Sequence, residues 1–212
     1  KSRILEPLLS RGACGAGEAS RLARSMNPGG GGSDIDYSDS TRSGWKLSAQ
    51  LSRLTIRASA YCSPRAPLRG DKDTGDAVNR ALDFWLIRDF QNSNWWWNVI
   101  GVPRSLGPVL LMLEDDLTSG QRSKGIEILG RGKLGMTGQN LVWVALITLN
   151  RGLLERDADV IRAAVASITD EIRVWEGEGI QADWSFYQHG DLLYSHGYGS
   201  RFASACSRIA TV

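Results

Sequence analysis

The sequence predicts an all-α protein built of antiparallel helical hairpins. From residue 44 onward, apolar residues recur three and four positions apart, which is the spacing of a single helix face. No segment shows the apolar–polar alternation of a half-buried strand, and the loops between the helical patterns are short, as in helical hairpins. Because no repeat of fixed period is visible, a bundle or a toroid of hairpins is favoured over a solenoid.

The expected helices are justified by their apolar positions and by the residues at their ends. Asp73 or Thr74, Thr137 and Asp157 can each cap a following helix, whereas a helix cannot easily continue into Pro64. The helical patterns, weak in the first two cases, span residues 1–11, 18–26, 47–61, 78–86, 106–113, 121–129, 142–153, 161–175 and 200–212. The last of these helices is expected still to run where the chain stops.

The N-terminal segment is expected to form a region of its own. Residues 1–33 combine the two weak helical patterns with a glycine-rich loop, and residues 34–212 form the main helical domain. The run Asn27-Pro28-Gly29-Gly30-Gly31-Gly32-Ser33 breaks any regular structure. Glycine-rich segments of this kind behave as flexible chains, so the run predicts a flexible loop or linker, with residues 27–33 disordered or looped.

Composition and charge exclude several classes of function. With 212 residues and 42% hydrophobic side chains, the chain suits one domain or part of a larger one. Its net charge of +2 carries no strong nucleic-acid footprint, and no apolar run reaches the length of a membrane span. No secretory signal is visible at Lys1, although a processed chain would lack one. Cys14, Cys62 and Cys206 lack the CxxC spacing of a zinc or redox site.

The first candidate binding feature is the stretch Asn94-Trp95-Trp96-Trp97-Asn98, followed by Ile100-Gly101-Val102-Pro103-Arg104. Neighbouring residues on a helix point about 100° apart, so three adjacent indoles cannot all face one core. At least one indole is therefore expected to be exposed, where its flat apolar face can pack on a sugar ring and its N–H can donate a hydrogen bond. The alternative is that two indoles lie in the core and the third covers a loop.

The second candidate feature is Gly135-Met136-Thr137-Gly138-Gln139-Asn140, which ends a loop and opens a helix. Asn140 falls in the first turn of that helix, where free backbone N–H groups and the helix dipole favour an anion. The amide of Asn140 can add a hydrogen-bond donor to a bound carboxylate. The alternative is an ordinary cap or turn residue.

The third candidate feature is the loop Ala182–Gly190 together with Tyr198-Gly199. This part of the chain holds both of its histidines, His189 and His196, between two helical patterns. His189 and Tyr198 are a candidate base and acid pair, since histidine titrates near 6.5 and tyrosine near 10 when unperturbed. Tyrosine acts as a base only if a cation or a hydrogen bond lowers its pKa. The alternative is a packed loop with one satisfied histidine.

Taken together, the three features resemble polysaccharide lyase family 8, the family of hyaluronate, chondroitin AC and xanthan lyases. The resemblance extends from about Asp34 to the end of the chain and depends on the order and spacing of four motifs. They are Asn-Trp-Trp ending in Ile-Gly-x-Pro-Arg at 94–104, Thr-Gly-x-Asn at 137–140, Asp-x-Ser-Phe-x-Gln-His at 183–189 and Tyr-Gly at 198–199.

The resemblance implies a fold, an activity and a set of site residues. The family folds its N-terminal catalytic domain as an incomplete (α/α) toroid and cleaves uronic-acid-containing polysaccharides by β-elimination, with no metal or organic cofactor. The implied partner is an extracellular anionic polysaccharide, with no role for nucleic acid or a membrane. The residues that the resemblance assigns are Asn140, His189 and Tyr198 for catalysis, and Asn94, Trp95, Trp96, Trp97 and Gln188 for substrate binding, with Trp97 at a position where the family varies.

The chain also departs from the family pattern. Family members are far longer, and they continue into the rest of the toroid, which holds a catalytic arginine, and into β-sandwich domains. The chain is therefore expected to be a fragment or a degenerate relative, truncated at the C-terminal end of the toroid. Two rival functions are a non-catalytic carbohydrate-binding helical module and a glycoside hydrolase, which would need two paired carboxylates such as Asp183 and Asp191.

Overall fold

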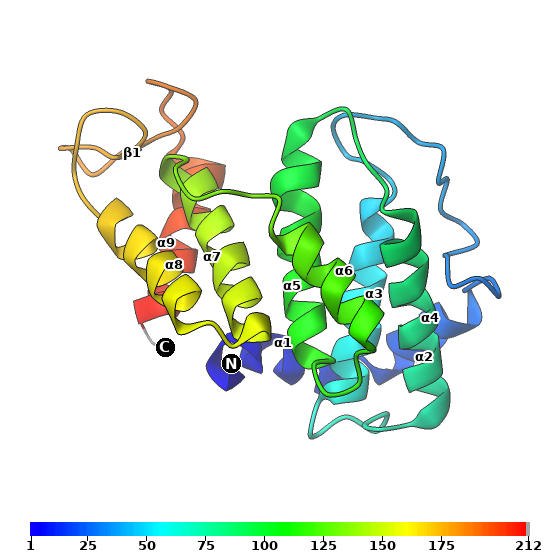
Figure 1. Ribbon diagram of the computed structural model, residues 1–212. Coiled ribbons are helices and arrows are strands. Elements are labelled where there is room, and N and C mark those ends of the chain that lie inside the picture. The colour runs from blue at the N-terminus through cyan, green and yellow to red at the C-terminus, as the bar shows by residue number, and fades with distance from the viewer. Residues whose placement is uncertain (211–212) are drawn as a thin grey trace. The chain divides into compact units, whose positions relative to one another are not determined.

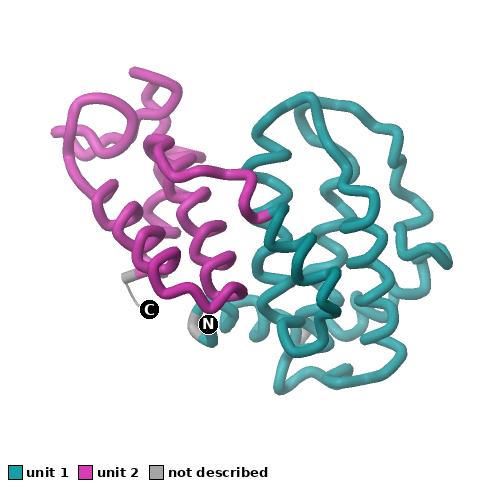
Figure 2. Tube along the Cα trace, viewed as in Figure 1, with its two compact units in different colours: residues 1–128 teal, residues 129–212 magenta. Residues whose placement is uncertain are grey.

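The computed structural model describes residues 1–210 and is dominated by helices, as predicted (Figure 1). These residues form nine α-helices, two short π-helical turns and two strands of two residues each. The chain divides into two compact units, residues 1–128 and 129–212 (Figure 2). The expected boundary at residues 33 and 34 therefore does not coincide with the division between the units. None of the described helices is long and apolar enough to cross a membrane.

Helix α3 is the central element of the first unit. It contacts α1, α2, α4 and α5, and the face of α3 that carries Leu51, Leu54 and Ala58 is buried. This is the face that the apolar spacing predicted. The elements of the unit are α1 (Ser2–Cys14), α2 (Ala16–Arg24), α3 (Ser48–Cys62), α4 (Lys72–Arg88), the π-helical turn η1 (Trp97–Gly101), α5 (Val102–Met112) and α6 (Ser119–Leu129).

The start of α4 differs from the prediction by two or three residues. The cap is Asp71, whose carboxylate accepts hydrogen bonds from the backbone N–H of Thr74 at 2.9 Å and from the Thr74 hydroxyl at 2.7 Å. Asp73 and Thr74, the expected caps, therefore both lie inside the first turn. A carboxylate three residues before the bonded N–H satisfies a donor that has no partner within the helix, and this geometry makes Asp71 the better cap.

The glycine-rich run forms a loop, as one of the two predicted alternatives, but the loop is packed and is not a flexible linker. Gly30, Gly31 and Gly32 are buried. The side chain of Gln50 accepts a hydrogen bond from Gly32 N–H at 3.2 Å and donates one to the Gly30 carbonyl at 2.9 Å. Gly30 has a φ of 99°, and a Cβ there would lie 2.2 Å from the Arg80 carbonyl oxygen. The glycines are required because the loop lies against α4 with no room for side chains.

The second unit is built on a hairpin of two helices. Arg156 takes a left-handed conformation (φ 58°) at the end of the first, and Asp157 caps the second by accepting from the N–H groups of Asp159 and Val160. The predicted role of Asp157 is thus confirmed. The elements of the unit are α7 (Gly138–Glu155), α8 (Ala158–Glu171), β1 (Gly179–Ile180), β2 (Phe186–Tyr187), the turn η2 (Ser195–Gly199) and α9 (Ser200–Ala210).

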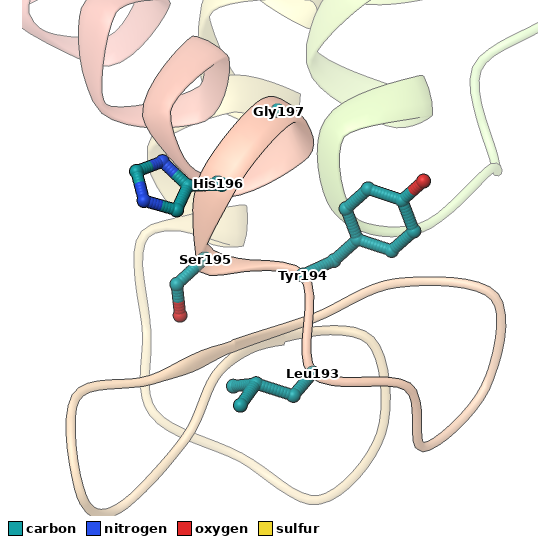
Figure 3. A pocket seen from close by; sticks show the side chains of 5 residues that line it. All are labelled: Leu193, Tyr194, Ser195, His196 and Gly197. Carbon is teal, nitrogen blue, oxygen red and sulfur yellow. The ribbon is translucent and has the colours of Figure 1, made fainter.

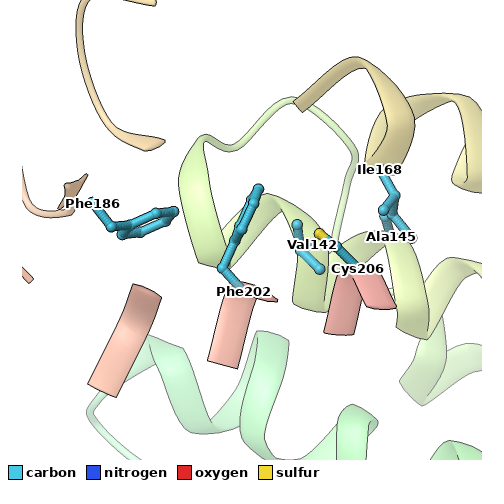
Figure 4. Close-up of a cluster of buried hydrophobic side chains, with 6 residues drawn as sticks. All are labelled: Val142, Ala145, Ile168, Phe186, Phe202 and Cys206. Atoms are coloured by element: carbon cyan, nitrogen blue, oxygen red, sulfur yellow. The ribbon is translucent and has the colours of Figure 1, made fainter. Parts of the chain in front are cut away.

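A small hydrophobic core joins α9 to the α7–α8 hairpin. Phe186 and Phe202 contact each other with ring centroids 4.9 Å apart (Figure 4). The body of Tyr198 packs against the same core. Helix α9 begins at Ser200 as predicted, whereas its expected continuation to the end of the chain lies outside the described residues. The other buried members of the cluster are Val142, Ala145, Ile168 and Cys206.

The chain between α8 and β2 departs most from the prediction. The helix expected to reach Trp175 ends at Glu171, and the chain then turns to form an antiparallel β1–β2 hairpin that the sequence did not predict. Trp175 joins this hairpin, because its backbone N–H donates to the Ile180 carbonyl and its indole N–H donates to the Glu178 carbonyl. The spacing of Ile168 and Trp175 is helical, yet Trp175 lies beyond the end of α8 and bonds to the hairpin.

Candidate functional site

The three adjacent tryptophans lie at the start of the π-helical turn η1 in the first unit: Trp95 and Trp96 precede it, and Trp97 is its first residue. Trp95 is 51% exposed, which confirms that at least one indole faces solvent. Trp97 packs inward, with its ring 5.7 Å from Trp45 and 5.2 Å from Trp96. A Cβ on Gly101 would lie 2.5 Å from the Trp97 ring, so a glycine is needed where the turn meets the indoles. π-helical turns of this kind often occur at functional sites.

Asn94 orders this turn through hydrogen bonds within the protein. Its Nδ2 donates to the Arg42 carbonyl at 3.1 Å, and its Oδ1 accepts from Trp96 N–H at 3.1 Å. Trp97 Nε1 donates to the same Arg42 carbonyl at 3.2 Å. Four substrate contacts were predicted in this unit, and the Trp95 side chain is the most exposed of them. Asn94 and Trp97 are instead hydrogen-bonded to the Arg42 carbonyl.

The N-terminus of α7 is occupied by the protein itself. A carboxylate oxygen of Glu171 accepts from Gly138 N–H at 2.5 Å, and Gln188 Oε1 accepts from Gln139 N–H at 2.8 Å. The expectation that free backbone N–H groups receive an external anion here is therefore wrong for these two groups, because the side chains of Glu171 and Gln188 already accept from them. Thr137 precedes the helix, but its hydroxyl donates to Glu178 Oε2 at 2.6 Å instead of capping α7.

Asn140 follows in the same first turn and, like Gln139, has a buried side-chain polar atom without a hydrogen-bond partner. Its Oδ1 is buried and has no hydrogen-bond partner. A buried polar atom without a partner costs about 1–3 kcal/mol, so native structures keep few of them. The Asn140 amide is therefore available to a ligand that can enter and bond to it.

The loop that carries His189 is fixed to α7 by the residue before it. Gln188 is fully buried, and besides accepting from Gln139 N–H it donates from Nε2 to the carboxylate of Glu178. A side chain with no exposed surface and with both ends bonded inside the protein positions its neighbour rather than contacting a ligand. The bond between Gln139 and Gln188 places His189 beside the turn that holds Asn140, although 49 positions separate them in sequence.

His189 and Tyr198 lie edge to face in one aromatic group. Their ring centroids are 5.0 Å apart at an interplanar angle of 80°, and Tyr194 lies 5.1 Å from Tyr198. On the other side, Tyr198 is 5.5 Å from Trp143, which follows Asn140 by three positions on α7. Residues three apart share a helix face. The structure thus brings Asn140, His189 and Tyr198 to one region of the second unit.

The electrostatics of Tyr198 favour its protonated form. Burial raises the pKa of the phenol, and the neighbouring Tyr194 and Glu178 raise it further, while Arg201 offsets only part of the effect. A tyrosine that acts as a base needs the opposite shift. The Tyr198 phenol is therefore protonated at neutral pH, and a nearby cation or hydrogen-bond donor would be needed to lower its pKa.

His196 is separated from this group by a kink. Gly197 takes a φ of 70° and ψ of −90°, which breaks η2 just after His196. His196 and Tyr194 point to opposite sides of the segment (Figure 3). His196 and Tyr194 nevertheless both line an open pocket of about 360 Å³, together with Leu193, Ser195 and Gly197.

Two residues near the site were not predicted from the sequence. Tyr194 completes the aromatic group, and Glu178 accepts hydrogen bonds from Thr137, Gln188 and Gly190. The run Gly177-Glu178-Gly179 is the signal that could have drawn attention to Glu178. Both glycines have positive φ values, 120° and 123°, as a sharply turning chain requires.

Trp184 is strained at the tip of the β1–β2 hairpin, and we expect its replacement by glycine to stabilise the protein. It has a φ of 66° and is 80% exposed, so little packing compensates the left-handed backbone. Trp184→Gly should raise the free energy of unfolding by about 1 kcal/mol in urea denaturation. Trp184→Ala keeps the Cβ and serves as the control, with no comparable gain. Equal stability of the two variants would show that the backbone strain is negligible.

The described residues thus form helical hairpins that carry an exposed indole and an Asn–His–Tyr group. The chain belongs to polysaccharide lyase family 8, because the family model of the N-terminal α-helical domain matches residues 18–212. The predicted fold class, an all-α chain of the incomplete (α/α) toroid type, is confirmed by this match and by the solved structure described next.

The chain is also similar to individual proteins that are named as polysaccharide lyases. The chain is 28% identical over 197 residues to chondroitinase-AC of Pedobacter heparinus, an alignment that covers 91% of this chain and 28% of that protein. It is 26% identical over 224 residues to a hyaluronate lyase of Thermasporomyces composti, covering 97% of this chain and 28% of the relative. A solved chondroitinase AC lyase superposes with a TM-score of 0.84 at 27% identity, covering 97% of this chain and 32% of that one. The chain thus spans less than a third of each of these proteins.

Proposed function

We propose that this chain is part of an extracellular lyase that cleaves a uronic-acid-containing polysaccharide of the hyaluronan, chondroitin or xanthan type by β-elimination. The observation that supports it most is the edge-to-face contact of His189 and Tyr198 beside the first turn of α7. Membership of the lyase family and the names of its relatives support the same class of substrate. The lyase is proposed to be extracellular because polymers of this size do not cross membranes.

Asn140 has the role of stabilising the uronate carboxyl group in this proposal. The proton to be removed lies on the carbon next to that group, and negative charge develops on the carboxyl oxygens as it leaves. An asparagine amide has a donor and an acceptor, so it can pair with a protonated carboxyl group through two hydrogen bonds. The unpartnered Oδ1 of Asn140 would accept a hydrogen bond from the carboxyl O–H, and its Nδ2 would donate to the other carboxyl oxygen, where the charge develops, as a donor of an oxyanion hole does.

Tyr198 and His189 have the role of moving the proton. The base takes the proton from the carbon next to the carboxyl group, a carbon–carbon double bond forms, and the glycosidic carbon–oxygen bond breaks. The same proton can then pass to the departing oxygen. Tyr198 can serve both steps if the two groups leave from one side of the ring, with His189 taking part as hydrogen-bond partner or proton carrier. Gln188 positions His189 and does not touch the sugar in this scheme.

A non-catalytic carbohydrate-binding module is the second candidate function for the chain by itself. The raised pKa of Tyr198 favours it, because the described residues do not by themselves make this phenol a base. The exposed face of Trp95 can bind sugar without any chemistry. The glycoside hydrolase alternative has less support, since Asp183 accepts from Ser185 N–H in a hairpin turn and belongs to no carboxylate pair that the structure describes.

Incubation with a panel of uronate polymers separates these functions. An elimination product carries a double bond conjugated with its carboxyl group and absorbs in the ultraviolet, whereas a hydrolysis product does not. We expect this absorbance to appear with at least one polymer. Binding without absorbance would identify a binding module, and new reducing ends without absorbance would identify a hydrolase.

The indole turn supplies a separate test of sugar binding. We expect Trp95→Ala with Trp96→Ala to weaken polysaccharide affinity by about 2 kcal/mol, the size of an aromatic hot spot, in isothermal titration calorimetry. Trp184→Ala, which removes an indole of even greater exposure, is the matched control. Unchanged affinity of a folded double variant would assign Trp95 and Trp96 to packing alone.

A further inference from the structure

The carboxylate of Glu178 connects three segments of the second unit. Oε2 accepts from the Thr137 hydroxyl at 2.6 Å and from Gln188 Nε2, while Oε1 accepts from Gly190 N–H at 3.1 Å. Thr137 precedes α7, and Gln188 and Gly190 lie on either side of His189. One side chain thus holds the start of α7 and both neighbours of the histidine.

The backbone at His189 needs such support. His189 has a φ of 60°, in the left-handed region that residues with a Cβ rarely adopt. Conformations of this kind cost about 1–3 kcal/mol and persist only where the surroundings enforce them. The hydrogen bonds from Gln188 and Gly190 to Glu178 enforce it from both sides, together with a bond from Gln188 N–H to the Leu192 carbonyl at 3.1 Å.

The same hairpin fixes the tyrosine. Tyr194 N–H donates to the Phe186 carbonyl at 2.7 Å, and Gly199 N–H donates to the Tyr194 carbonyl at 3.0 Å, on either side of Tyr198. Phe186 lies in β2, which pairs with β1, and β1 begins at the residue after Glu178. The positions of His189 and Tyr198 therefore depend on one hairpin, which Glu178 fastens to α7.

We propose that Glu178 is a positioning residue, which holds His189 and Tyr198 in place against the first turn of α7. The inference rests on the proposed function, because the positioning matters for elimination only if the chain takes part in it. Glu178 acts through Gln188 and Gly190 and does not itself touch the substrate. A shift of about 1 Å in reacting groups can cost about 100-fold in rate, so loss of this support should lower the rate strongly.

The hydrogen-bond directions make Glu178→Gln a sharp test. The new side chain keeps only one acceptor oxygen, so its NH₂ group must face either Gln188 Nε2 or Gly190 N–H, and two donors meet in both arrangements. Gln188 cannot relieve this by rotating its amide, because its Oε1 already accepts from Gln139 N–H. The conflict must therefore move the loop. In the double variant Glu178→Gln with Gln188→Glu, both oxygens of residue 188 accept, and donors and acceptors match again. Glu176→Gln, an exposed glutamate two positions earlier, is the control for the loss of charge.

The experiment combines amide hydrogen exchange at Gly190, measured by NMR, with steady-state kinetics on a uronate polymer. We expect Glu178→Gln to speed exchange at Gly190 by about 10-fold or more and to lower kcat by about 10- to 100-fold with little change in KM. The double variant should restore both, and Glu176→Gln should change neither.

The outcomes separate the two levels of the proposal. Faster exchange with an unchanged kcat would overturn the positioning role while leaving the proposed function intact. Unchanged exchange at Gly190 would overturn the claim that Glu178 holds the loop. If the unaltered chain forms no product, the proposed function fails, and the exchange data still decide whether Glu178 holds His189 in place.

Discussion

Replacing Tyr198 with Phe is expected to lower the elimination rate by about 10²–10⁴-fold, the contribution of a positioned acid or base. The change removes one proton-transferring oxygen and almost no contact area, so affinity for the polymer should stay nearly the same. Rates and affinities are compared by product absorbance and by calorimetry. Tyr187→Phe, in the same unit, is the control and should keep its activity.

The pH dependence of the rate gives this prediction a second readout. Burial raises the pKa of Tyr198, so the deprotonated form that can act as a base becomes populated only at a more alkaline pH than for an unperturbed tyrosine. We expect kcat to increase with pH in the alkaline range and this increase to vanish in Tyr198→Phe. An increase that survives in the variant would assign the base to another group.

Replacing Gly30 with Ala is expected to destabilise the first unit by about 3 kcal/mol, from the sum of overpacking and left-handed backbone strain. The new Cβ would lie 2.2 Å from the backbone carbonyl oxygen of Arg80, which cannot move without displacing α4. Urea denaturation followed by circular dichroism measures the loss. If residues 27–33 were a flexible loop, Gly30→Ala would leave the free energy of unfolding unchanged, and that result would contradict the prediction.

Gly29→Ala is the matched control for this experiment. Gly29 is the neighbouring glycine, and a Cβ there would meet only the Asn27 side chain at 3.5 Å, an ordinary contact. Its stability should therefore change by about 0.5 kcal/mol or less, as for most surface substitutions. Equal losses in the two variants would contradict the close approach of Gly30 to α4.

Local patterns in the sequence were sufficient for most of the fold. Helices α3, α4, α5, α7 and α9 lie where apolar spacing predicted them, because one buried face leaves a period of 3.6 residues that can be read without knowing the partner. Asp157 caps α8 for a similarly local reason, since its bonded N–H groups are two and three residues away. The family resemblance depended in the same way on the spacing of short motifs.

The candidate site was predicted in part. The motifs selected Asn140, His189 and Tyr198, and the structure brings these three to one region, but their catalytic roles remain proposals. Gln188 was expected to bind substrate and is instead fully buried between Gln139 and Glu178. A sequence does not distinguish a glutamine whose amide faces a ligand from one whose amide is hydrogen-bonded inside the protein.

The sequence by itself determined the helical class, the family and the motifs of the candidate site. Only the tertiary structure decided that the glycine run is buried, that α8 ends at Glu171, and that Glu178 fastens the His189 loop to α7. The physical reason is the range of the interactions. Helix periodicity and capping act over a few residues, whereas the contacts of Gly30 with Arg80 and of Gln139 with Gln188 join positions about 50 apart, which no local pattern records.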